Sequence, residues 1–219
     1  MTSSDIYIVG EDDVTREVIM RIIKEFAPSL NIIGALPARG SELKTKITNF
    51  NHLAQTIPIV LLSDLDTIDC APLAKASLLK EIETQHPHFI INIAVDEAEA
   101  WLFADRKGFA HFLQVNEADM PMAKEEKFGG LRKRKEISLP IKASYYLTHV
   151  LMKKSTNKER RKQLLARLGA CKGPEYNSTM IPFIRQSWNI HEAMTHSYSL
   201  QGTVRRVQRL AEVLQTVGR

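Results

Sequence analysis

The stretch that decides the fold is "IPIVLLSDLDTIDC", which runs from Ile57 to Cys70. It begins as an unbroken apolar run and ends with three acids, Asp64, Asp66 and Asp69. A continuous apolar run of this length is typical of a strand buried on both faces of a parallel sheet. Three like charges placed directly after such a strand repel one another. They therefore need either separate structural roles or a shared ligand.

The first half of the chain repeats this pattern. Three other short β-rich runs occur, at 5–10 ("DIYIVG"), 30–36 ("LNIIGAL") and 88–95 ("HFIINIAV"). Helical periodicity separates the runs, at 13–26, 41–55 and 71–85. Buried strands that alternate with helices of this length predict an α/β fold, Rossmann-like, with a mostly parallel sheet and helices on both faces. A fourth helix is expected to begin in "DEAEAWLFAD", residues 96–105.

The second half of the chain differs in both pattern and charge. After about residue 110 the strand pattern disappears, and "KFGGLRKRKEI" (127–137) is predicted to be a glycine-punctuated basic loop between helices. Residues 1–110 contain 10 Lys/Arg and 16 Asp/Glu, whereas residues 111–219 contain 20 Lys/Arg and 9 Asp/Glu. The sequence therefore suggests an α/β core at 1–110 and a basic helical extension at 111–219 that packs on it.

The basic half suits a polyanionic partner such as nucleic acid, although basic residues also cover ordinary solvated helix faces. No sequence-specific DNA- or RNA-binding motif is present, so any contact would be made to phosphates. The candidate nucleic-acid-binding residues are Arg132, Lys133, Arg134, Lys135, Lys172, Arg205, Arg206 and Arg209.

Several classes of protein are disfavoured by what the sequence lacks. Its two cysteines do not form a CxxC pair, so neither a disulfide framework nor a thiolate zinc site is indicated. It contains neither a Walker A loop nor GxGxxG, which disfavours an ATPase or a dinucleotide enzyme. The N-terminus does not resemble a signal peptide, and no apolar run is long enough for a membrane helix. We therefore expect a cytoplasmic protein with no membrane partner.

Acids follow three of the four predicted strands, in the segments Glu11–Asp13, Asp64–Asp66 and Asp96–Glu99. In an open parallel sheet, ligands bind beyond the carboxyl ends of the strands. In extended chain, Asp64 and Asp66 point to the same side, while Leu65 points to the other. Carboxylate oxygens are the ligands that Mg²⁺ prefers, so a divalent cation would relieve the repulsion among these acids.

A structural role is the simpler interpretation for any single acid. Asp12 or Asp13 would cap the first helix, and Asp69 would cap the helix that begins near Ala71-Pro72. Caps need one acid each, whereas these strand ends carry clusters. The clusters therefore favour a metal site, with Asp69 assigned to capping.

The segment "IYIVGEDDVTREVIMRII" resembles the start of a response-regulator receiver domain. This resemblance implies that Asp12 and Asp13 hold Mg²⁺ and that Asp64 is phosphorylated. The pattern is not continued, because the fourth strand runs into "AVDEAEAW" and no fifth strand with Lys-Pro follows.

A second resemblance rests on Glu11 after the first strand, on Asp64-Leu65-Asp66 after the third, and on "DEAEAWLFAD" with Glu99, Trp101 and Asp105. These motifs resemble the TOPRIM fold of topoisomerases, primases and OLD-type nucleases, and small TOPRIM-like proteins of prokaryotic defence loci. The match covers about the first 105 residues. It departs from the usual Glu-Gly order, since this chain has Gly10-Glu11.

The TOPRIM resemblance implies a Mg²⁺- or Mn²⁺-dependent nuclease that hydrolyses phosphodiester bonds in DNA or RNA. Glu11, Asp64 and Asp66 would be catalytic and would bind metal, and Glu97 and Glu99 would bind a second ion. It also implies a role in defence against phage or foreign DNA, with a separate ATPase subunit, and a homo-oligomer is a candidate assembly. The alternatives are a receiver-like module phosphorylated on Asp64 and a non-catalytic nucleic-acid-binding subunit.

Overall fold

The computed structural model describes residues 4–38, 42–65, 70–128 and 132–217. The chain forms two compact units, one made of residues 1–94 and 202–219 and the other of residues 95–201. These units differ from the segments 1–110 and 111–219, because residues 95–110 belong to the second unit and most of the last helix belongs to the unit that contains the sheet.

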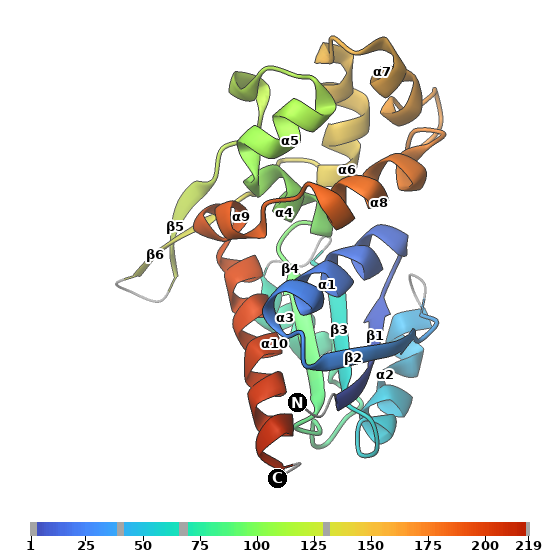
Figure 1. Cartoon of the computed structure of the whole chain (residues 1–219), viewed down its shortest axis with the longest axis vertical. Coiled ribbons are helices and arrows are strands. Elements are labelled where there is room, and N and C mark those ends of the chain that lie inside the picture. The colour runs from blue at the N-terminus through green and yellow to red at the C-terminus, as the bar shows by residue number, and fades with distance from the viewer. Residues whose placement is uncertain (1–3, 39–41, 66–69, 129–131, 218–219) are drawn as a thin grey trace. The chain divides into compact units, whose positions relative to one another are not determined.

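The first unit contains a four-stranded parallel sheet in the order β2-β1-β3-β4 (Figure 1). Its strands are β1 (Ser4–Gly10), β2 (Leu30–Ala35), β3 (Ile59–Asp64) and β4 (Phe89–Ala94). In β3 every residue before Asp64 is buried, as expected for a central strand with both faces covered. The predicted α/β fold with a parallel sheet is therefore confirmed.

Helices cover both faces of this sheet. They are α1 (Asp13–Phe26), α2 (Glu42–Leu53), α3 (Ala71–Leu78) and most of α10 (Tyr198–Val217). Right-handed crossovers place α1 on one face and both α2 and α3 on the other (Figure 1). Helix α3 ends at Leu78 rather than at the predicted residue 85.

The strand order creates a topological switch point between β1 and β3. From β1 the chain passes to β2, which is the neighbour of β1 on one side. It later returns to β3, which is the neighbour of β1 on the other side. The register aligns Gly10 of β1 with Leu62 of β3, and Leu62 with Asn92 of β4. Open α/β sheets bind ligands just beyond the carboxyl ends of the strands at such a point.

The second unit is largely helical around an aromatic core that includes Trp101, Phe109, Phe183 and Trp188. Its α-helices are α4 (Ala98–Ala104), α5 (Arg106–Leu113), α6 (Ala143–Tyr145), α7 (Lys158–Leu164), α8 (Tyr176–Gln186) and α9 (Ile190–His196). Its other helical turns are η1 (Glu117–Asp119), η2 (Tyr146–Val150, a π-helix) and η3 (Leu151–Lys154).

The predicted basic loop at 127–137 is wrong in part, since most of this segment lies in an antiparallel hairpin. Strand β5 (Lys124–Phe128) pairs with β6 (Arg132–Glu136). The register places Lys124 opposite Glu136 and Glu125 opposite Lys135, and opposite charges across a strand pair are favourable. The hairpin lacks the apolar alternation by which strands are recognised, so the sequence pattern missed it.

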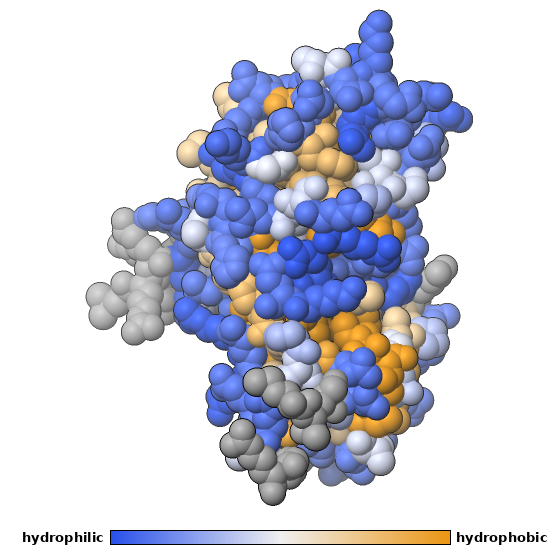
Figure 2. Space-filling model, in the orientation of Figure 1, coloured by the Kyte–Doolittle hydropathy of each residue, from blue (hydrophilic) through white to orange (hydrophobic). Residues whose placement is uncertain are grey.

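In the described ranges, no helix has the length and apolar character needed to cross a membrane. On the face drawn in Figure 2, the first unit shows an apolar patch toward the β2 edge of its sheet. Strand β2 lies at that edge, and its residue Ile33 is 42% exposed.

Candidate active site at the carboxyl edge of the sheet

The three acids that follow β1 have three different sets of contacts. Asp12 caps α1, because its Oδ1 accepts hydrogen bonds from the backbone nitrogen of Thr15 at 2.8 Å and from its hydroxyl at 2.9 Å. Asp13 lies in the first turn of α1 and forms an ion pair with Arg16. Glu11 reaches across to the neighbouring strand β3.

Glu11 is held at the end of β3 by two donors. The hydroxyl of Ser63 donates to Oε1 of Glu11, and the backbone nitrogen of Asp64 donates to the same oxygen at 3.2 Å. Two donors on one carboxylate oxygen fix the orientation of the group. Glu11 and Asp64 are therefore brought together at the β1–β3 switch point, as the sequence predicted for adjacent strand ends.

The tight turn from β1 into α1 depends on a glycine. A Cβ atom at Gly10 would lie 2.9 Å from the backbone nitrogen of Arg16, closer than such atoms approach in real structures. The guanidinium of Arg16 also donates to the carbonyl oxygen of Gly10 at 3.2 Å. Because the turn is this compact, Glu11 stays at the carboxyl edge of the sheet beside β3.

The end of β3 agrees with the predicted alternation as far as it is described. Asp64 is partly exposed, whereas Leu65 is 7% exposed and donates its backbone N–H to the carbonyl of Ala94 at 2.9 Å. Asp66 and Asp69 lie outside the described residues, so their predicted roles as ligand and cap stay predictions. At the start of α3 the N-cap residue is Cys70, whose side chain makes no capping hydrogen bond.

Glu97 and Asp96 belong to the second unit and bind the start of its α6 region. Oε2 of Glu97 accepts from the backbone nitrogen of Ser144 at 2.7 Å, and its Oε1 lies 3.7 Å from Nζ of Lys142. Asp96 has a left-handed backbone with a φ of 67° and accepts from the backbone nitrogens of Leu139 and Ala143. Burial raises the pKa of the Asp96 carboxyl, although these two hydrogen bonds oppose the shift.

Glu99 is 3% exposed and has its own partners within the second unit. Its Oε1 accepts from the hydroxyl of Tyr176 at 2.7 Å and lies 3.4 Å from Nζ of Lys172. That ammonium also lies 4.6 Å from the centre of the Tyr176 ring, a cation–π contact. Glu97 and Glu99 are thus engaged by different cations, and their predicted binding of a second metal stays a prediction.

The other residues of the "DEAEAWLFAD" segment have structural contacts. The indole nitrogen of Trp101 donates to the hydroxyl of Ser199 at 2.8 Å, in the core of the second unit. Asp105 is 2% exposed and accepts from the backbone nitrogens of Gly108 and Asn189, at 3.1 and 2.9 Å. This carboxyl therefore joins the start of α5 to Asn189, the N-cap of α9, and its burial raises its pKa.

The predicted nucleic-acid-binding residues are spread over both units. Arg132 and Lys133 lie in β6, where their side chains are not described. In the same strand the guanidinium of Arg134 lies 3.9 Å from the centre of the Tyr198 ring, and Lys135 is exposed. In the first unit, Arg205 and Arg209 are exposed on α10, and Arg206 binds Asn92 of β4. These residues therefore belong to two different units, 95–201 and the unit that contains 202–219.

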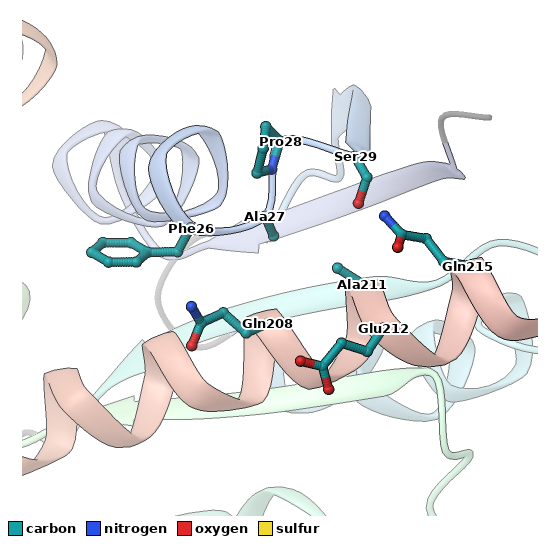
Figure 3. A pocket seen from close by; sticks show the side chains of 8 residues that line it. All are labelled: Phe26, Ala27, Pro28, Ser29, Gln208, Ala211, Glu212 and Gln215. Carbon is teal, nitrogen blue, oxygen red and sulfur yellow. The ribbon is translucent and has the colours of Figure 1, made fainter. Parts of the chain in front are cut away.

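A pocket of about 380 Å³ lies away from the acids, between the end of α1 and α10 (Figure 3). Its lining residues are Phe26, Ala27, Pro28, Ser29, Gln208, Ala211, Glu212 and Gln215. Helix α1 begins at the carboxyl edge of the sheet and ends at Phe26, so the pocket lies toward the opposite edge. It takes no part in the candidate site.

Among the described residues, no group of three or more His, Cys, Asp or Glu side chains is placed to hold a metal ion. Glu11 and Asp64 nevertheless fit a hard cation, since both offer carboxylate oxygens and Mg²⁺ commonly uses only one or two protein carboxylates. Sequence reasoning missed Ser63, Lys142 and Tyr176, which hold the candidate acids. Ser63 could have been recognised from the sequence, because it is the single polar residue before Asp64 in an apolar strand.

Comparison with known proteins found one matching family model, described as "Domain of unknown function (DUF4276)", over residues 9–181. Among solved structures, the C-terminal region of the Burkholderia pseudomallei OLD protein is similar, with 16% sequence identity and a TM-score of 0.39. That match covers 97% of this chain and 89% of the other. A likeness this distant supports no inference about fold or activity. The search of curated proteins found no match.

Proposed function

Since the chain belongs to the DUF4276 family, whose description assigns no activity, we propose from its own residues that it is a metal-dependent nuclease for DNA or RNA. One observation carries this proposal: the carboxylates of Glu11 and Asp64 come from adjacent strand ends at the β1–β3 switch point, where Glu11 is held by Ser63 and by the Asp64 backbone. Open α/β sheets place their ligand sites there.

The donor set suits Mg²⁺ or Mn²⁺. Glu11 and Asp64 would hold such an ion, with Asp66 as a further ligand and Glu97 and Glu99 as candidate ligands for a second ion. A bound divalent cation would polarise the phosphoryl oxygen of a substrate and lower the pKa of a bound water. Without a cation, the acids at this edge would repel a phosphodiester.

Glu11 has the features expected of a group that orients or deprotonates a water. Its carboxylate is already positioned by the donors from Ser63 and Asp64, so it loses little orientational freedom when a substrate binds. A carboxylate in reach of the attacking water would accept its proton while the phosphodiester bond breaks. Cations of the chain would bind the neighbouring phosphates of the substrate.

The resemblance of "DEAEAWLFAD" to small TOPRIM-like proteins of defence loci supports a role in defence against foreign nucleic acid. The sequence carries no Walker A loop, so an ATP-driven step would need a separate ATPase subunit.

A cleavage assay tests the proposal. Labelled single-stranded DNA, double-stranded DNA and RNA would be incubated with the purified chain in Mn²⁺, in Mg²⁺ or in EDTA. We expect metal-dependent cleavage of at least one substrate, and Asp64→Asn should lower the rate by about 100-fold with little change in melting temperature. Asp13→Asn removes the same charge from a residue assigned to an ion pair in α1, and it should retain the rate within about threefold.

Two results would count against a nuclease. One is the absence of cleavage in every metal and substrate, and the other is an Asp64→Asn variant as active as the wild type. Acid-labile labelling of Asp64 by a small phosphodonor would instead support the receiver-like alternative. In the described residues the parallel sheet ends at β4, without the fifth strand that such a module would need.

A further inference from the structure

Strand β4 carries one buried amide among apolar residues. Asn92 is fully buried, and its neighbours in "FIINIA" are all hydrophobic. Its Nδ2 donates to the carbonyl of Leu61 at 3.1 Å, and its Oδ1 accepts from Nε of Arg206 at 2.7 Å. A buried amide costs free energy unless it is hydrogen-bonded, so this residue type needs a reason at this position. The contact with Arg206 provides one.

Arg206 is held in a defined orientation although it is an exposed residue. Besides the contact with Asn92, its Nη2 donates to the hydroxyl of Thr203 at 3.2 Å, one turn earlier on α10. Thr203 is itself fully buried. A planar guanidinium fixed through two of its nitrogens loses less freedom when it binds an anion. Within the described part of the chain, Arg205 and Arg209, its basic neighbours on α10, are exposed and make no comparable hydrogen bond to the sheet.

The anchored arginine lies toward the carboxyl edge of the sheet. Asn92 is in register with Leu62 of β3, and Leu62 with Gly10 of β1. Glu11 follows Gly10 directly, and Asp64 follows Leu62 by one intervening residue. Adjacent strands are about 4.8 Å apart, so Asn92 holds Arg206 within a few strand spacings of both acids. All of these residues belong to the first unit.

A second cation lies near Arg206. Lys75 is on α3, and its pKa is lowered first by burial and then by the charge of Arg206. Two cations within each other's field are unfavourable together, and a bound anion would relieve the repulsion. The guanidinium of Arg206 that Asn92 and Thr203 hold, rather than Lys75, is the group that would contact an anion.

We infer that Arg206 forms a phosphate-binding subsite that holds a backbone phosphate of DNA or RNA next to the acids at the strand ends. Asn92 is the positioning residue of this subsite, because it orients Arg206 from inside the sheet. This inference rests on the proposed nuclease function and gives that site its substrate contact. Phosphate contacts carry no sequence information, in agreement with the absence of a base-reading motif.

Binding without metal tests the subsite separately from catalysis. Fluorescein-labelled 12-nucleotide DNA and RNA of one sequence would be titrated with the full chain in EDTA, with fluorescence anisotropy as the readout. We expect Arg206→Gln to weaken binding of at least one of them by about 10-fold. Lys80→Gln removes the same charge from an exposed residue after α3 and should change affinity less than about twofold.

A double-mutant cycle tests the positioning role of Asn92. Asn92→Leu keeps the side-chain volume and removes the acceptor for Arg206, so affinity should fall by about three- to tenfold. In an Arg206→Gln background the same substitution should cause no further loss, whereas a purely structural effect would persist. If Asn92→Leu does not fold by circular dichroism, Arg206→Lys is measured in its place. Lysine lacks the planar guanidinium that Asn92 and Thr203 hold, so this variant should bind the oligonucleotide at least about threefold more weakly than wild type.

The outcomes separate this inference from the nuclease proposal. Equal losses in Arg206→Gln and Lys80→Gln, or wild-type chain that binds neither oligonucleotide in EDTA, would overturn the subsite. Arg206-dependent binding by a chain that never cleaves would support the subsite and remove the nuclease function. Cleavage that is unaffected by Arg206→Gln, with unchanged binding, would leave the nuclease function and remove the subsite.

Discussion

At the residue scale, one position along the chain separates a structural acid from a candidate catalytic acid. Glu11, Asp12 and Asp13 have the same chemistry, and the sequence left open which of them faces a metal. The structure gives these acids different contacts, since Asp12 caps α1 and Asp13 forms an ion pair with Arg16 in its first turn. Glu11 is thereby left at the edge of the sheet, beside Asp64.

Glu11→Gln should therefore separate activity from stability. The variant keeps an oxygen that accepts from Ser63 and from the Asp64 backbone, so the free energy of unfolding should change by less than about 1 kcal/mol. It removes the negative charge, so metal-dependent cleavage should fall by about 100-fold. Urea denaturation and the cleavage assay are the two measurements. A variant that cleaves like wild type would exclude Glu11 from catalysis.

The pattern of acids predicted the pairing of Glu11 with Asp64 but not the groups that hold them. Adjacent parallel strands end at the same edge, so acids after β1 and β3 had to meet. The partners of Glu97 and Glu99 could not be predicted, because Ser144, Lys142, Tyr176 and Lys172 are distant in the sequence. Such contacts depend on tertiary packing, which no local periodicity encodes.

At the element scale, the contribution of helix α10 to the core of the first unit can be measured by substitution. Most of its length belongs to the unit that contains the sheet, where Leu210 is 3% exposed. Leu210→Ala should lower the free energy of unfolding by about 2–4 kcal/mol. Val213 on the same helix is 41% exposed, so Val213→Ala should cost less than about 0.5 kcal/mol. Equal and small effects in urea denaturation would show that α10 contributes little to this core.

The elements that the sequence predicted well are those with strong periodicity. The four strands of the parallel sheet and α1 appear where their apolar patterns predicted them, because buried strands and an amphipathic helix leave a clear pattern in the sequence. The β5–β6 hairpin was missed because its strands pair through charged residues. The association of α10 with the sheet was also missed, since an amphipathic helix fits against any apolar surface.

At the scale of the whole molecule, the stability of the second unit should depend on pH. Among the described residues of that unit, Asp96, Asp105 and Glu136 have raised pKa values, and burial is the main cause in each. Glu136 accepts from the Ser197 hydroxyl and, at 2.8 Å, from the backbone nitrogen of Ser199. These hydrogen bonds oppose the effect of burial without cancelling it.

A raised pKa means that the folded state holds the proton more tightly than the unfolded state. The resulting stabilisation is fully present below the ordinary pKa, which is 4.5 for Glu136, and is lost as the pH rises through the folded pKa. Stability of the second unit should therefore be lower at pH 8 than at pH 5.5. Each unit of pKa shift corresponds to about 1.4 kcal/mol.

Tryptophan fluorescence during urea denaturation measures this effect in the second unit, because both tryptophans, Trp101 and Trp188, lie there. Glu136→Gln removes one titrating carboxyl, so the difference in unfolding free energy between pH 5.5 and pH 8 should shrink. Glu117→Gln changes an exposed acid in the same unit and should leave that difference unchanged. If both variants keep the wild-type pH dependence, the titration of Glu136 does not contribute to the stability of this unit.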